Sequence, residues 1–141
     1  MKQYASRLII AGCLFFLPNL SIAADYSGHW LGTITESVNN CKDLGKAKPG
    51  NYKLTIEQEG NDVVIMENIV RRPYTGHFTP EHPQRIHVQG SYSIDGGYVN
   101  EMVNIDFEGD AAGKGKSIWR WSDGYFACGG TFSFSLEKLK P

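Results

Sequence analysis

The sequence lacks the features of a membrane-spanning, nucleic-acid-binding or helical protein. No stretch holds the roughly 20 consecutive apolar residues that a transmembrane helix needs, and 14 basic residues are balanced by 15 acidic ones. A chain without excess positive charge has no general attraction to polyanions, so we expect no nucleic-acid partner and no anionic membrane surface. Apolar residues seldom recur at helical spacing, which argues against a helical fold.

Known catalytic and cofactor-binding motifs are also missing. The chain has no G-x-S-x-G elbow, no H-E-x-x-H pair and no glycine-rich phosphate loop. Its three cysteines show no C-x-x-C spacing, which gives little support to zinc or redox chemistry. We therefore expect a protein that is not an enzyme and that holds no cofactor or metal.

The N-terminus has the three parts of a secretory signal peptide. Lys2 and Arg7 precede an apolar stretch at 8–17, and small residues follow before position 25. We expect residues 1–24 to be removed and residues 25–141 to form one domain in the periplasm or the extracellular medium. This removal leaves 12 basic against 15 acidic residues, a formal charge of −3.

Ile10-Ala11-Gly12-Cys13 supports an alternative, because it looks like a lipobox whose cysteine would carry lipid. The residues after Cys13 are apolar where a lipoprotein usually turns polar, so we favour its removal with the signal.

Cys41 and Cys128, which remain in the mature chain, predict a disulfide, as expected of an even pair in an exported protein. The bond would close a loop of nearly ninety residues. Loop closure of this length is worth about 4 to 5 kcal/mol by chain entropy.

Alternation of apolar and polar residues predicts a single antiparallel β-barrel of seven or eight strands, with a β-sandwich as the alternative. Gly90 is expected to bend one long strand. We expect the segment 109–115 to be a loop. The expected strands are 28–36, 52–57, 63–70, 86–94, 99–108, 117–121 and 126–137.

Gly28-His29-Trp30 resembles the G-x-W that opens the first strand of lipocalin-like and avidin-like barrels, the calycin group. The resemblance covers this tripeptide and the strand count. It implies that Trp30 closes one end of a barrel and that a basic residue of the last strand lies across its ring. Lys138 is the candidate, and a cation–π contact would be the physical reason. The general layout also looks like small exported β-domains of bacteria.

Trp119 and Trp121 stand two residues apart and therefore share one face of their strand. If that face points inward, the indoles are core or barrel lining. If it points outward, they form a sugar-stacking platform together with Tyr125. A third possibility is that they line an open barrel mouth. Trp30, Trp119, Trp121 and Tyr125 are the candidate ligand-binding residues. Alternation also places the aromatic residues of the last strand, from Phe126 onward, on one side, and we expect them to line the same space.

Three histidines, His77, His82 and His87, surround Glu81 and raise the possibility of a metal site. Their spacing of five residues does not converge on one side of a strand or helix, so we expect a solvated segment.

The alternating acids Asp106, Glu108 and Asp110 resemble the start of a calcium loop. Ala111 stands where that loop needs glycine, so we expect the wet face of a strand. A glycosidase-type carboxylate pair would also need a cleft.

We expect a binding module for a small apolar or sugar-like ligand. The alternative is a protein-binding envelope factor, such as an inhibitor of a secreted hydrolase. It would present the segment 71–84, which contains the exposed pair Arg71-Arg72 and three prolines and is expected to be irregular or an edge strand.

Overall fold

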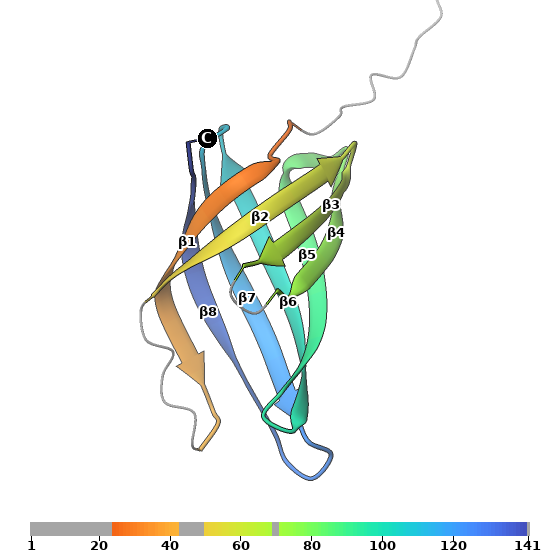
Figure 1. Ribbon diagram of the computed structural model, residues 1–141, viewed down its shortest axis with the longest axis vertical. Coiled ribbons are helices and arrows are strands. Elements are labelled where there is room, and N and C mark those ends of the chain that lie inside the picture. Colours follow the sequence, from red (N-terminus) through yellow and green to blue (C-terminus); the bar gives the residue numbers. More distant parts are fainter. Residues whose placement is uncertain (1–23, 43–49, 69–70, 141) are drawn as a thin grey trace, which may run out of the picture.

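The computed structural model describes residues 24–42, 50–68 and 71–140, which form a closed antiparallel barrel of eight strands (Figure 1). Each strand pairs with the next along the chain, and the last pairs back onto the first. Within these residues no helix is present. The strands are β1 (Gly28–Asn39), β2 (Asn51–Glu59), β3 (Asp62–Glu67), β4 (Pro73–Thr79), β5 (His82–Ile94), β6 (Gly97–Glu108), β7 (Ala112–Ser122) and β8 (Ala127–Lys138).

The predicted barrel is confirmed, and closure distinguishes it from the alternative sandwich. The continuous strand through Gly90 is also confirmed as β5. Residues 1–23 of the predicted signal peptide 1–24, which include the lipobox cysteine Cys13, lie outside the described residues, so the signal peptide stays a prediction. Among the described residues, no helix of the length and apolarity needed to cross a membrane occurs.

The prediction that the segment 71–84 is irregular or an edge strand is wrong, because β4 and the start of β5 occupy most of it and β4 pairs with both β3 and β5. Its prolines lie where a strand tolerates the missing N–H. Pro73 is the first residue of β4, and Pro80 lies in the turn. Pro83 lies near the start of β5, beside an irregular register at Phe78 and Thr79. The protein-binding alternative therefore has no long loop to present, although the function itself stays a prediction.

The predicted loop 109–115 is also shorter than expected, because β7 begins at Ala112. Gly109 has a φ of 70°, which favours glycine and allows a tight reversal between β6 and β7. Gly113 and Gly115 lie within β7. Because glycine has no side chain, the alternation of apolar and polar residues did not indicate a strand at these positions.

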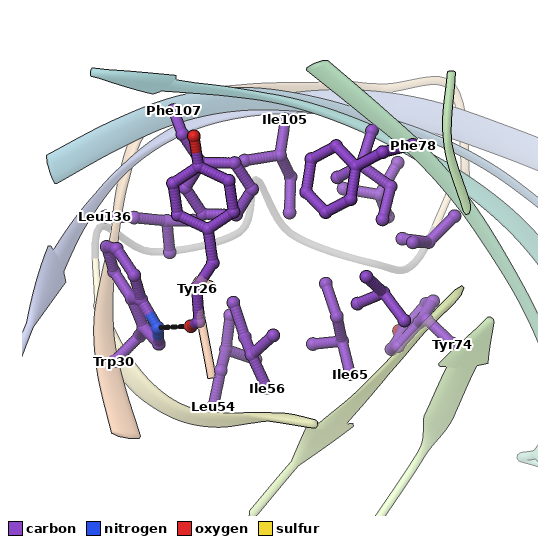
Figure 2. Packing of buried hydrophobic residues seen from close by; sticks show 14 of the residues in the cluster. Tyr26, Trp30, Leu54, Ile56, Ile65, Tyr74, Phe78, Ile105, Phe107 and Leu136 are labelled. Carbon is purple, nitrogen blue, oxygen red and sulfur yellow. Dashed lines mark hydrogen bonds between the residues drawn. The ribbon is translucent and has the colours of Figure 1, made fainter. Parts of the chain in front are cut away.

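One end of the barrel is closed by aromatic packing (Figure 2). Tyr26 enters this end just before β1 and stacks on Phe107, with ring centroids 3.9 Å apart. Trp30 has no exposed surface, and its indole N–H donates to the carbonyl of Tyr26 at 2.9 Å. The Lys138 Nζ lies 5.6 Å from the centroid of the Trp30 ring, which confirms the contact implied by the calycin resemblance.

The opposite end carries the predicted disulfide between Cys41 and Cys128, which is confirmed. It joins the segment after β1 to the second residue of β8, across 87 positions of the chain. A disulfide is consistent with an oxidising compartment.

The wall of the barrel has two heights. Strands β1 and β5 to β8 have 11–13 residues, whereas β2, β3 and β4 have 9, 6 and 7. At the disulfide end the long strands extend beyond the short ones (Figure 1). The register agrees, because the pairing of β4 with β5 stops at Gln89 and leaves the last five residues of β5 without a β4 partner.

Candidate functional site

A cavity of about 920 Å³ occupies the half of the barrel that faces the disulfide. Its inner wall is formed by core side chains such as Val103, Ile105 and Phe134, and its outer part includes Cys41 and Cys128. The cavity reaches the surface, because the lining residue Phe126 is 75% exposed. Volumes of this size are typical of sites for small molecules.

Glycines explain why large aromatic side chains leave this half hollow. A Cβ built at Gly32, Gly97 or Gly115 would collide with the ring of Tyr52, Trp121 or Phe134 respectively. Each ring therefore lies along the wall over a glycine of the neighbouring strand instead of filling the centre. The aromatic surface is kept, and the space between opposite walls stays open.

The two tryptophans of β7 both line the cavity. Trp121 donates from its indole N–H to the carbonyl of Ile94 at 3.0 Å, which fixes this ring beside the β5–β6 turn. This placement agrees with the interpretation of Trp119 and Trp121 as lining near the mouth and excludes an outward-facing platform.

The other two candidate residues are not brought to the cavity. Trp30 belongs to the closed end, where it packs against Phe107 at a centroid distance of 5.5 Å. Tyr125 lies in the turn between β7 and β8, is 92% exposed and is not among the lining residues. Its neighbour Phe126, which alternation placed on the inner side with the other aromatic residues of the last strand, lines the rim instead.

A buried carboxylate, that of Glu101 on β6, is the polar centre of the cavity wall. The residue is only 5% exposed and accepts three hydrogen bonds from hydroxyl groups. Tyr74 and Tyr92 donate to its Oε2 at 2.8 and 3.2 Å, and Ser117 donates to its Oε1. Burying a charged group is unfavourable unless it is hydrogen-bonded, and these three donors provide the hydrogen bonds that the carboxylate needs.

The register of the strands explains how the donors reach this carboxylate. Gly90 of β5 lies directly opposite Glu101, and Tyr74 comes from β4 on the far side of β5. A Cβ at Gly90 would lie 2.7 Å from the Tyr74 ring, so only glycine lets the ring cross β5. Tyr92 stands two residues beyond Gly90 on the same face, and Ser117 is the diagonal neighbour of Glu101 on β7.

The carboxylate and the burial of the site act on the tyrosines of the wall. Burial, and secondly the negative charge of Glu101, raise the pKa values of Tyr52, Tyr74 and Tyr92 above the ordinary value. The positive charge of Arg72 acts in the opposite direction on the pKa values of Tyr74 and Tyr92. All three phenols are therefore neutral at physiological pH, and those of Tyr74 and Tyr92 act as donors to Glu101.

Arg72 is itself part of the cavity wall and is half-buried, not freely exposed as the dibasic sequence suggested. Its guanidinium carbon lies 3.7 Å from the centroid of the Tyr92 ring. The charged lining residues are Lys42, Glu67, Arg72, Asp95 and Glu101, so the wall has three acidic and two basic groups.

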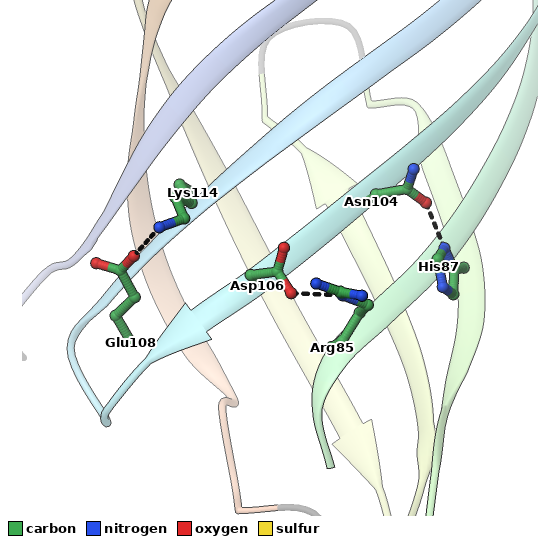
Figure 3. A network of polar contacts seen from close by, with 6 residues as sticks. All are labelled: Arg85, His87, Asn104, Asp106, Glu108 and Lys114. Carbon is green, nitrogen blue, oxygen red and sulfur yellow. Dashed lines mark hydrogen bonds and ion pairs between the residues drawn. The ribbon is translucent and has the colours of Figure 1, made fainter. Parts of the chain in front are cut away.

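The three histidines and Glu81 that were considered as metal ligands are exposed to solvent. His77 and His87 are cross-strand partners in β4 and β5, and His87 hydrogen-bonds to Asn104 (Figure 3). In the described part of the chain, no three His, Cys, Asp or Glu residues are placed to hold a metal ion.

Two of the acids considered as calcium ligands have basic partners on the outer face of the barrel. Asp106 pairs with Arg85 at 2.6 Å, and Glu108 pairs with Lys114 at 2.6 Å (Figure 3). The expected wet strand face is therefore confirmed for both.

Glu101 was missed by the sequence reasoning, although a signal for it exists. It has the same parity as Val99, Val103 and Ile105, whose side chains face the interior. An acidic residue on an apolar face is informative, because carboxylates are seldom buried without partners. The next residue, Met102, points to the opposite face and is 57% exposed. At this point β6 therefore places a polar side chain inside the barrel and an apolar one outside.

Comparison of the chain with protein-family models, curated proteins and solved structures found no match. What the site can do follows from its geometry. An apolar space that opens to solvent can enclose an apolar molecule, and a fixed carboxylate on its wall can accept a hydrogen bond from that molecule.

Proposed function

We propose that the protein is a non-enzymatic binding module that encloses a small, largely apolar ligand in the barrel. The observation that carries this proposal is the cavity of about 920 Å³, which reaches the surface near Phe126. Trp119 and Trp121 supply aromatic surface on its wall. A sugar-like ligand is less well supported, because most of the residues that line the cavity are apolar or aromatic.

The physical reason is the contrast between the two ends of the barrel. Protein interiors are usually packed as densely as organic crystals, and empty space lined by apolar groups lowers stability. The end around Tyr26 and Trp30 meets this expectation, but the end around Trp119 does not. A ligand in the cavity would remove apolar surface from water at a gain of about 25 cal/mol per Å².

We also propose that the barrel is calycin-like and that the chain is exported after removal of residues 1–24. The closed antiparallel barrel is compatible with that fold, and the contact of Lys138 with Trp30 supports it. The disulfide between Cys41 and Cys128 supports a periplasmic or extracellular location.

Uptake of an apolar fluorescent probe, N-phenylnaphthylamine, tests the proposed function. We expect saturable binding with enhanced probe emission and with protection of tryptophan from acrylamide quenching. Trp119→Ala should weaken binding about tenfold, which corresponds to about 1.4 kcal/mol. Ile118→Ala is the matched control, because Ile118 is the preceding residue of β7 and faces solvent. Equal affinity of both variants, or no saturable binding at all, would exclude the cavity as the site.

A further inference from the structure

The chemistry of Glu101 extends the proposed function from a cavity to a class of ligand. We infer that the cavity takes an amphipathic molecule whose polar end is a protonated amine, held by the Glu101 carboxylate. This inference rests on the proposed binding function and adds the identity of the polar group.

The first argument is that, among the described residues, no cationic side chain forms an ion pair with the Glu101 carboxylate. The phenols of Tyr74 and Tyr92 and the hydroxyl of Ser117 are neutral donors. They solvate the carboxylate but leave its negative charge in the wall of an apolar cavity. In the described ranges, the ion pairs of Arg85 with Asp106 and of Lys114 with Glu108 lie on the outer face, and neither involves Glu101. A cationic group on a ligand would provide a direct partner of opposite charge.

The second argument is that one acceptor position of Glu101 receives no hydrogen bond from the part of the chain that the structure describes. A carboxylate offers about four lone-pair sites, two on each oxygen. Tyr74 and Tyr92 occupy those of Oε2, whereas Ser117 alone donates to Oε1. One acceptor site therefore remains on a side chain that lines the cavity. An ammonium group has only donors and matches this site, whereas a ligand carboxylate has none to offer.

The third argument comes from the surroundings of the carboxylate. Trp119 lies directly opposite Glu101 in the β6–β7 register, and its indole lines the same cavity. Aromatic faces attract cations, and Arg72 already makes such a contact with the Tyr92 ring in this wall. The lining residues carry one more acidic than basic group, which also favours a cation.

Arg72 is the group that would favour the opposite choice, a ligand with an anionic end. Its guanidinium is engaged with the Tyr92 ring, and its side chain is half-buried, whereas Glu101 is almost fully buried. Electrostatic interactions strengthen with burial, so Glu101 has the larger influence on a ligand that enters the cavity.

A series of ligands with one tail and three head groups tests the inference. Binding of octylammonium, octanol and octanoate is measured by calorimetry on the disulfide-bonded protein after removal of any co-purified ligand. A charge-assisted hydrogen bond predicts that octylammonium binds at least about tenfold more tightly than octanol. Octanoate should bind more weakly than either. This comparison needs no variant and is independent of how substitutions affect folding.

Two matched substitutions then locate the preference. Glu101→Gln should reduce the preference for octylammonium over octanol to about threefold or less, because the amide keeps the shape of the side chain and removes its charge. Glu108→Gln changes the same residue type on the outer face of the same strand and should leave the preference intact.

The outcomes separate the two proposals. Equal binding of the three compounds, a preference that survives Glu101→Gln, or tightest binding of octanoate that is lost in Arg72→Gln would overturn the inference and leave the proposed cavity function standing. If neither these compounds nor N-phenylnaphthylamine binds, both proposals fail.

Discussion

Removal of a single hydroxyl group, that of Tyr74, tests whether the Glu101 carboxylate is held as the structure has it. Tyr74 is buried, and its phenol donates to Glu101 Oε2 at 2.8 Å. A hydrogen bond to a charged group contributes about 1.5–3 kcal/mol to stability. Tyr74→Phe removes this donor, keeps the ring and leaves one carboxylate position unsatisfied. We expect the free energy of unfolding to fall by about 2 kcal/mol.

Two further tyrosines calibrate this value. Tyr92 donates to the same oxygen at 3.2 Å and is half-buried, so Tyr92→Phe should reduce stability by about 1 kcal/mol. Tyr98 is exposed on the outer face of β6, so Tyr98→Phe should stay within about 0.5 kcal/mol of the unaltered protein. Urea unfolding followed by tryptophan fluorescence, with the disulfide intact, gives all three values under one condition.

A double-mutant cycle decides whether the loss comes from the bond to Glu101. If Tyr74 acts through the carboxylate, Tyr74→Phe and Glu101→Gln should couple by about 1 kcal/mol or more. Additive effects, or a Tyr74→Phe variant as stable as Tyr98→Phe, would refute the reasoning. The polar centre of the cavity would then not be a fixed carboxylate.

Three other perturbations have defined outcomes. Gly90→Ala places a Cβ 2.8 Å from the Pro73 carbonyl oxygen and against the Tyr74 ring, so urea unfolding should show a loss of about 1–3 kcal/mol; wild-type stability would contradict the crossing of the ring over β5. Replacement of Cys41 and Cys128 by serine should lower the unfolding free energy by up to about 4.5 kcal/mol, from the 87-residue separation; no change in the urea midpoint would exclude this constraint. Because burial and Glu101 raise the pKa values of Tyr74 and the other two wall tyrosines above 10.0, the stability that they contribute is complete below that pH. It is lost as the pH rises through the folded values, so tyrosinate absorbance should appear together with unfolding; full ionisation near the ordinary pKa in an intact barrel would be the contrary result.

The fold could be predicted from sequence because apolar and polar residues alternate along most strands and so distinguish the inner face from the outer face. Trp119 and Trp121 share a parity, and this alone placed both rings on one side of β7. The tripeptide around Trp30 indicated the closed end, and Lys138 was found at the expected contact. The prediction failed at residues 71–84. Proline cannot donate a hydrogen bond within a sheet, but the sequence does not show at which strand positions no such bond is needed.

The site could be predicted only in part, since it depends on contacts between strands that are distant in sequence. The alternation of residues along β7 predicts which side chains share the face of Trp121, but it does not predict whether the space inside the barrel is packed or hollow. The cavity depends on glycines that face rings on neighbouring strands, such as Gly97 beneath Trp121. The hydroxyl donors of Glu101 come from β4, β5 and β7, and only the register brings them together.

The cluster around Glu101 is difficult to explain by stability alone. Apolar side chains of similar volume at a buried charged site are often neutral or stabilising, because they avoid the desolvation of the charge. Leucine at position 101 with phenylalanine at positions 74 and 92 would preserve the shape of this wall without burying a carboxylate. The sequence instead supplies Glu101, three hydroxyl donors and a glycine at position 90 that admits one of them. Such preorganisation of a charged group in a hollow space is what recognition of a cationic ligand requires, because the donors that orient the carboxylate are in place before the ligand arrives.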